Sequence, residues 1–157
     1  MSFKLSQGSL DKLEGVHPDM VKCVKSAIEW TKVDFGVTCG VRSKSEQAEL
    51  FKAKVTKTMN SKHLIQKSTG MSHAVDLMAF VGSRASWELN LYDDIADAMA
   101  QASKTHGVPI KWGAAWSIGN IAQWNSSMEG AMNSYIDLRR SEGRRPFIDG
   151  PHFELIQ

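Results

Sequence analysis

The chain has 157 residues, of which 42% are hydrophobic and 23% charged, and its formal net charge is +2. This length is typical of one domain, which buries roughly 68–70% of the surface of its unfolded chain. The composition excludes a disordered, collagen-like or coiled-coil chain. The charge is too small to indicate nucleic-acid binding by itself. Cys23 and Cys39 are too few for a disulfide framework, so we expect two small buried side chains in a reducing compartment.

The first predicted element is a helix that starts at Pro18, because proline suits the first helical position. Alternating apolar and polar residues then predict a strand over 35–42. A capping-box pattern of Ser43 and Glu46 predicts the start of the next helix. The polar residues 56–72 predict a long exposed loop.

The second half of the chain predicts strands over 73–80, 108–112 and 152–156, a helix over 89–105, and a helical excursion at about 116–145. Helices and strands do not alternate as regular βαβ units. The order therefore predicts an α+β fold with a small, mostly antiparallel sheet flanked by helices. We expect one domain over residues 1–157.

No segment has the features of a signal peptide or a transmembrane helix. The most apolar stretch, 74–81, is interrupted by Asp76 and is far shorter than the ~20 residues that span a bilayer. We therefore expect synthesis in a cytoplasm and no stable insertion into a membrane.

Two histidines and an aspartate are candidates for a metal site. Asp76 lies within an apolar strand, where a buried carboxylate has to be paired. His63 lies in the polar loop before it, and His152 begins the last strand. Two histidines and one carboxylate form a three-ligand zinc set that leaves a fourth position for water.

His73 competes with His63 for this role. Because side chains alternate along a strand, His73 and Asp76 would point to opposite faces, which favours His63. We expect His17 and His106 to have roles at helix ends instead.

Asp149 lies three residues before His152, across a Gly-Pro turn. A carboxylate near a metal can take a proton from a water molecule there. Aspartate before glycine is also common in turns that have no catalytic role. The sequence leaves both interpretations open.

Residues 61–63, 73–77 and 149–155 together resemble the motifs of the LAS metallopeptidases. More narrowly, they resemble VanY-like D-alanyl-D-alanine carboxypeptidases and phage L-alanyl-D-glutamate endolysins. The likeness runs nearly end to end and is weakest between about 116 and 145. It implies a fold like that of Hedgehog and the DD-peptidases.

The resemblance also implies one Zn²⁺ and a role for several residues. Its motif positions place the metal ligands at His63, Asp76 and His152. The catalytic carboxylate falls on Asp149, and the arginine that holds the substrate or the developing oxyanion falls on Arg42, whose planar guanidinium suits that role. Gln47 lies near a position where relatives carry a polar substrate contact.

Two features depart from the family pattern. The His and Asp ligands are seven residues apart in typical relatives, whereas an apparent insertion at 64–72 separates His63 from Asp76 by thirteen positions. Added length in a loop costs little free energy. Relatives often carry an acid at the position of Ala115.

The resemblance implies a phage endolysin that cleaves peptidoglycan stem peptides between L-Ala and D-Glu during host lysis. We expect a monomer that reaches the wall from the host cytoplasm through a holin-type membrane lesion. The alternatives are a D-Ala-D-Ala carboxypeptidase and a non-catalytic, zinc-containing wall-binding module. A basic cluster near the end of the chain is expected to be a solvated surface rather than a nucleic-acid site; it comprises Arg139, Arg140, Arg144 and Arg145.

Overall fold

The computed structural model describes residues 2–56 and 58–156. The helices are α1 (Gln7–Lys12), α2 (Pro18–Trp30), α3 (Lys44–Lys52), α4 (Leu89–His106), α5 (Met128–Ser141) and the short 3₁₀ helix η1 (Ile121–Gln123). The strands are β1 (Asp34–Cys39), β2 (Ile65–Gln66), β3 (Met71–Ser72), β4 (Ala74–Val81), β5 (Arg84–Ser86), β6 (Ile110–Trp112) and β7 (His152–Leu155).

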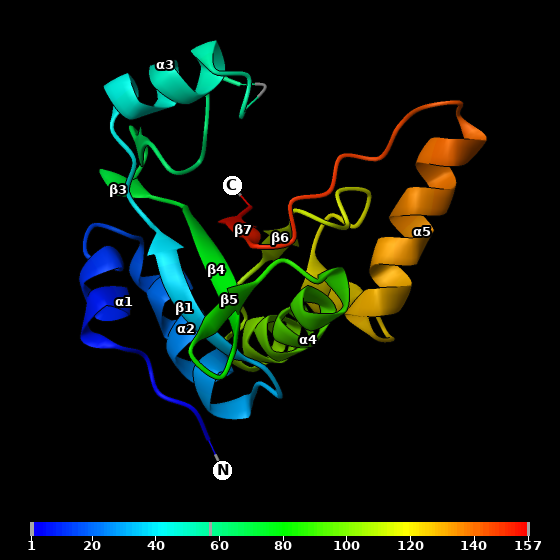
Figure 1. The fold of residues 1–157 in the computed structure, drawn as a ribbon, viewed down its shortest axis with the longest axis horizontal. Helices are drawn as coiled ribbons and strands as arrows, with labels where there is room; N and C mark the ends of the chain where they lie inside the picture. Colours follow the sequence, from blue (N-terminus) through cyan, green and yellow to red (C-terminus); the bar gives the residue numbers. More distant parts are fainter. Residues whose placement is uncertain (1, 57, 157) are drawn as a thin grey trace.

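One antiparallel sheet organises the molecule. Its strands lie in the order β1-β4-β7-β6, and β5 pairs with β4 (Figure 1). A second, two-stranded sheet joins β2 to β3. The architecture confirms the predicted α+β fold with a small antiparallel sheet.

The sheet has one buried apolar face. Alternate residues of its strands join the core with residues of α2 and α4; those of the strands include Val37, Val75, Leu77, Phe153 and Leu155. The residues between them point to the other face. Figure 1 shows α3 and α5 at opposite ends of the molecule, with β7 between them.

A β-bulge changes the register of β1 near its end. Val37 pairs with Leu77, but the next pair is Cys39 with Asp76, so the chain takes one extra residue at Thr38. An extra residue turns the following side chain to the other face of the sheet. Cys39 is therefore only half-buried, whereas Cys23 is fully buried as expected.

Several predicted boundaries differ from the structure. The strand expected over 35–42 ends at Cys39, and the strand expected from 108 begins at Ile110. Part of the loop expected over 56–72 forms the β2–β3 hairpin. The expected excursion at 116–145 contains η1 and α5 joined by irregular segments. Among the described residues, no helix is both long and apolar enough to cross a bilayer.

Candidate active site

Three adjacent strands present a row of chemically active side chains. Cys39 of β1 pairs with Asp76 of β4, and Asp76 pairs with His152 of β7. Residues directly opposite each other on neighbouring strands project from the same face. The sheet therefore brings these three side chains together on the face opposite the apolar core.

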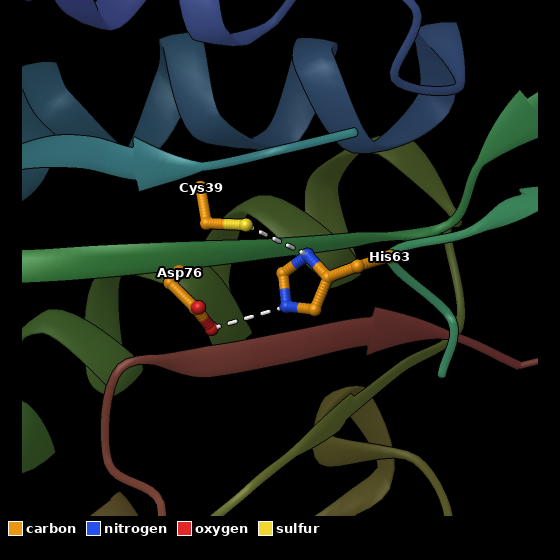
Figure 2. A group of neighbouring side chains, drawn as sticks. All are labelled: Cys39, His63 and Asp76. Carbon is orange, nitrogen blue, oxygen red and sulfur yellow. Dashed lines mark hydrogen bonds and ion pairs between the residues drawn. The ribbon is translucent and has the colours of Figure 1, made fainter. Parts of the chain in front are cut away.

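His63 joins this row from the loop that precedes β2. Its Nε2 lies 3.3 Å from Asp76 Oδ1, and His152 Nδ1 lies 3.5 Å from the same oxygen. His63 Nδ1 lies 2.8 Å from the carbonyl oxygen of Gly40. Because a carbonyl only accepts hydrogen bonds, Nδ1 carries a hydrogen and Nε2 is the nitrogen directed at Asp76. Figure 2 shows the His63 ring in contact with Cys39 through one nitrogen and with Asp76 through the other.

The insertion at 64–72 does not displace His63, because its two ends are tied together. The amide of His73 donates to the carbonyl of Lys62 at 2.8 Å, and the amide of Arg42 donates to the carbonyl of His63 at 2.9 Å. The added residues form the β2–β3 hairpin beyond this closure. His63 therefore reaches Asp76 despite the long separation in sequence.

His73 lies apart from this group. It is 1% exposed, and its Nε2 is 2.7 Å from the hydroxyl of Thr69. Its ring packs edge-on against that of His17, with centroids 5.5 Å apart. His73 therefore belongs to the packing at the base of the hairpin.

Asp149 is held beside His152 by a pair of bonds to Gly113. The amide of Asp149 donates to the carbonyl of Gly113, and the amide of Gly113 donates to the carbonyl of His152, both at 2.8 Å. A Cβ at Gly113 would collide with the Asp149 carbonyl and lie 2.9 Å from His152 Cβ. Glycine is therefore required at this point by the close approach of the two segments.

Arg42 reaches the same site from the segment between β1 and α3. Its Nη2 lies 3.8 Å from Asp76 Oδ2 and 3.6 Å from Cys39 Sγ. Its Nη1 donates to Gln47 Oε1 at 2.8 Å. Gln47 is 0% exposed, and its Nε2 donates to the backbone oxygen of Thr58. Gln47 thus lies behind Arg42 and orients it, outside the lining of the cavity in which a substrate contact was expected.

The charged groups of the site shift one another's pKa values. Burial would lower the pKa of His63, but its bonds to Asp76 and Cys39 raise that pKa to about 10. For His152, burial is likewise outweighed by bonds to Asp76 and Glu154, and the pKa is about 9. The two imidazoles hold the pKa of Asp76 far below its ordinary value despite burial. Metal binding would have to displace the protons on His63 Nε2 and His152 Nδ1, the two nitrogens that face Asp76.

Two other groups have shifted pKa values. Burial raises the pKa of Asp149, which suits a carboxylate that has to accept a proton. The pKa of Cys39 is lowered, because its interactions with His63 and Arg42 outweigh burial and the charge of Asp76.

A cavity of about 490 Å³ opens onto these side chains. Arg42, Asp149 and His152 line it beside an aromatic wall of Trp116 and Phe147, whose ring centroids are 6.3 Å apart. The remaining polar lining includes Lys62, His63, Asp76 and Glu154. The cavity can therefore hold a polar chain against an apolar wall.

The donor atoms fit a single metal ion. Two groups have ligand atoms that lie within 4.8 Å of one another: Cys39 with His63 and Asp76, and Asp76 with Asp149 and His152. Both groups share Asp76. Imidazole nitrogens and carboxylate oxygens suit zinc and related divalent cations.

Sequence reasoning missed Cys39 and Trp116 as residues of the site. Alternation along β1 predicts an inward Cys39, and the bulge that reverses it has no marker in the sequence. The shared face of His152 and Glu154 does follow from their spacing of two in a strand, and the two side chains are in contact.

Comparisons with known proteins agree with the geometry. The phage L-alanyl-D-glutamate peptidase family matches residues 1–156. The L-alanyl-D-glutamate peptidase of Escherichia phage T5 is 27% identical over 157 residues, covering 99% of this chain and 100% of the relative. The crystal structure of the Serratia marcescens L-Ala D-Glu endopeptidase ChiX has a TM-score of 0.70 at 28% identity, covering 99% of this chain and 91% of that one.

Proposed function

Because the chain belongs to the phage L-alanyl-D-glutamate peptidase family, we propose that it is a zinc-dependent endolysin that cleaves the L-Ala–D-Glu bond of peptidoglycan stem peptides. His63, Asp76 and His152 would hold one Zn²⁺. The 3.3 Å and 3.5 Å separations of the two imidazoles from Asp76 support this ligand set.

When bound, zinc supplies Lewis acidity that polarises the scissile carbonyl and acidifies a water molecule. Asp149 lies beside His152 and takes the proton of the attacking water, then passes it to the amine of the leaving D-Glu. Its raised pKa favours the first of these steps.

Arg42 has the reach to stabilise the oxyanion that forms on the carbonyl oxygen. Its guanidinium lines the cavity and is held in place by Gln47. Hydrogen-bond donors fixed in advance stabilise developing charge without having to reorganise. Gln47 therefore acts through Arg42 in this proposal.

The proposal is tested by mass spectrometry of the fragments released from purified peptidoglycan. Cleavage between L-Ala and D-Glu leaves muramoyl-L-alanine on the glycan and frees peptides that begin with D-Glu. Release of D-Ala alone would indicate the carboxypeptidase, and no release would indicate a wall-binding module. Loss of activity with a chelator and recovery with Zn²⁺ tests the metal.

The family and both relatives are named for cleavage between L-Ala and D-Glu. This favours the endopeptidase over the carboxypeptidase and the wall-binding module. The single peptidase domain over 1–157, the monomeric state and access to the wall through a holin-type lesion stay predictions.

A further inference from the structure

His152 is enclosed on several sides by neighbouring groups. Its Nδ1 lies 3.5 Å from Asp76 Oδ1, and its Nε2 lies 2.8 Å from Glu154 Oε1. The ring of Trp116 covers it at a centroid distance of 5.7 Å, and the ring of His63 approaches at 5.2 Å. Only the two ring nitrogens make polar contacts, and each meets a different carboxylate.

These two contacts assign different tasks to the two nitrogens. A carboxylate only accepts hydrogen bonds, so the short contact to Glu154 requires a hydrogen on Nε2. A histidine that binds a cation through one nitrogen keeps its hydrogen on the other. Nδ1 is the nitrogen directed at Asp76, which both possible ligand groups share.

We infer that Glu154 is the positioning residue of the metal site: it holds the Nε2–H of His152, so that Nδ1 is the atom presented to the cation. The inference rests on the proposed metal site and adds a residue to it. Without Glu154, the tautomer with its hydrogen on Nδ1 would have no lone pair there for the cation, and a flip of the ring about Cβ–Cγ would put Cδ2 in the place of Nδ1.

The strand geometry supports this role. His152 and Glu154 project from the same face of β7, two residues apart. Glu154 lies between Ala74 of β4 and Lys111 of β6 in the register of the sheet. Its backbone is therefore fixed on both sides, and its side chain is only 18% exposed.

The experiment compares Glu154→Ala and Glu154→Gln with the wild-type chain. Zn²⁺ affinity is measured by competition with a chromophoric chelator. A long-range ¹H–¹⁵N correlation spectrum of the zinc-loaded protein shows which nitrogen of His152 carries the hydrogen. We expect Glu154→Ala to lower zinc affinity by about 10–100-fold and to lose the single Nε2–H form. Glu154→Gln retains an acceptor oxygen, so its affinity should lie between the two.

Lys111→Ala is the matched control, because it changes the cross-strand neighbour of Glu154 without removing the bond to His152. It should keep the wild-type affinity and spectrum. If Glu154→Ala does not fold, as judged by circular dichroism, the Gln variant alone carries the test.

Two results would overturn the inference. Wild-type zinc affinity and an unchanged His152 spectrum in the Glu154 variants would remove the positioning role. A raised KM for hydrolysis, measured on the same zinc-loaded Glu154 variants, with unchanged zinc affinity would make Glu154 a substrate contact instead. Absence of zinc binding by the wild-type chain would be a failure of the proposed function itself, so the two failures are distinguishable.

Discussion

Asp76 is the residue on which the site converges, because one of its carboxylate oxygens faces both imidazoles. A lone carboxylate at this depth would be costly, and its two histidine partners offset that cost in the absence of a cation. The same oxygens can ligate a metal when the imidazole protons leave. This exchange of protons for a cation explains why charged, paired residues stand on the face of the sheet opposite the apolar core.

The first prediction concerns the ligands. Replacing His63, Asp76 or His152 by alanine should each lower zinc affinity by more than the ~10–100-fold typical of an outer-shell contact. His73→Ala is the matched control and should keep full zinc, because its ring contacts Thr69 and His17 instead. Zinc is measured by elemental analysis after dialysis. Equal zinc in the wild type and His63→Ala would show that this histidine is not a ligand.

A second prediction separates proton transfer from metal binding. Asp149→Asn preserves the size of the side chain and the backbone bonds to Gly113, so zinc content should be retained. Turnover should fall by about 10²–10⁴-fold, the usual contribution of general acid–base catalysis. Asp137→Asn, at an exposed position on α5, should leave the rate unchanged.

Zinc and hydrolysis should be measured on the same Asp149→Asn preparation. Full zinc with a near-wild-type rate would make Asp149 a turn residue only. Loss of both would make it part of the support of the metal site.

At the scale of elements, the sequence predicts those helices and strands that carry a local pattern of residues. Ser43 caps α3 with both bonds of the capping box, and the alternation of β4 correctly separates Asp76 from its apolar neighbours. The bulge in β1 and the β2–β3 hairpin depend on tertiary contacts, such as the bond from His73 to Lys62. Neither has a short sequence pattern that identifies it, so Cys39 was assigned to the wrong face.

The third prediction concerns the contact between the Gly113 segment and the Asp149–His152 turn. Gly113→Ala inserts a methyl group against the Asp149 carbonyl, so one of the two segments has to move. We expect a loss of about 1–3 kcal/mol in the free energy of unfolding, as for other overpacked sites, together with a loss of hydrolysis.

Gly119→Ala is the control for this change, since no atom lies within 4 Å of the added carbon and its φ is ordinary. Denaturant unfolding and hydrolysis are measured on both variants. Wild-type stability and activity in Gly113→Ala would show that the turn is not held by this contact.

At the scale of the whole molecule, the basic cluster lies next to the catalytic cavity: Arg139 lines a shallow hollow with Trp116 and Phe147, which also line that cavity. The cluster occupies the end of α5 and the segment after it, and the Arg139 guanidinium donates to the carbonyl of Arg145. Such a surface raises the rate of encounter with anionic polymers more than affinity for the scissile peptide.

The fourth prediction is that hydrolysis of whole peptidoglycan slows as salt rises, since screening shortens to about 8 Å at physiological ionic strength. Neutralising the four arginines of the basic cluster should remove this salt dependence. Hydrolysis of a short soluble stem peptide should be insensitive to salt in both proteins. Salt dependence that survives neutralisation would show that the cluster is only a solvated surface.

The fifth prediction follows from the charges of the site and concerns the stability of the whole chain against pH. In the metal-free protein, the pKa of His63 is raised from 6.5 to about 10 and that of His152 from 6.5 to about 9. A raised pKa in the folded state stabilises it fully below the unfolded value of 6.5. This stabilisation is lost as the pH rises through about 9 to 10.

Thermal unfolding should therefore show that the metal-free protein loses stability between about pH 7 and 10. Zinc binds the unprotonated imidazoles, so its stabilising effect should grow over the same range. The measurement is the unfolding midpoint at a series of pH values, with chelator and with zinc. His63→Ala lacks the larger of the two shifts and should flatten both curves. If its metal-free curve matches that of the wild type, the coupling between His63 and Asp76 does not govern this pH dependence.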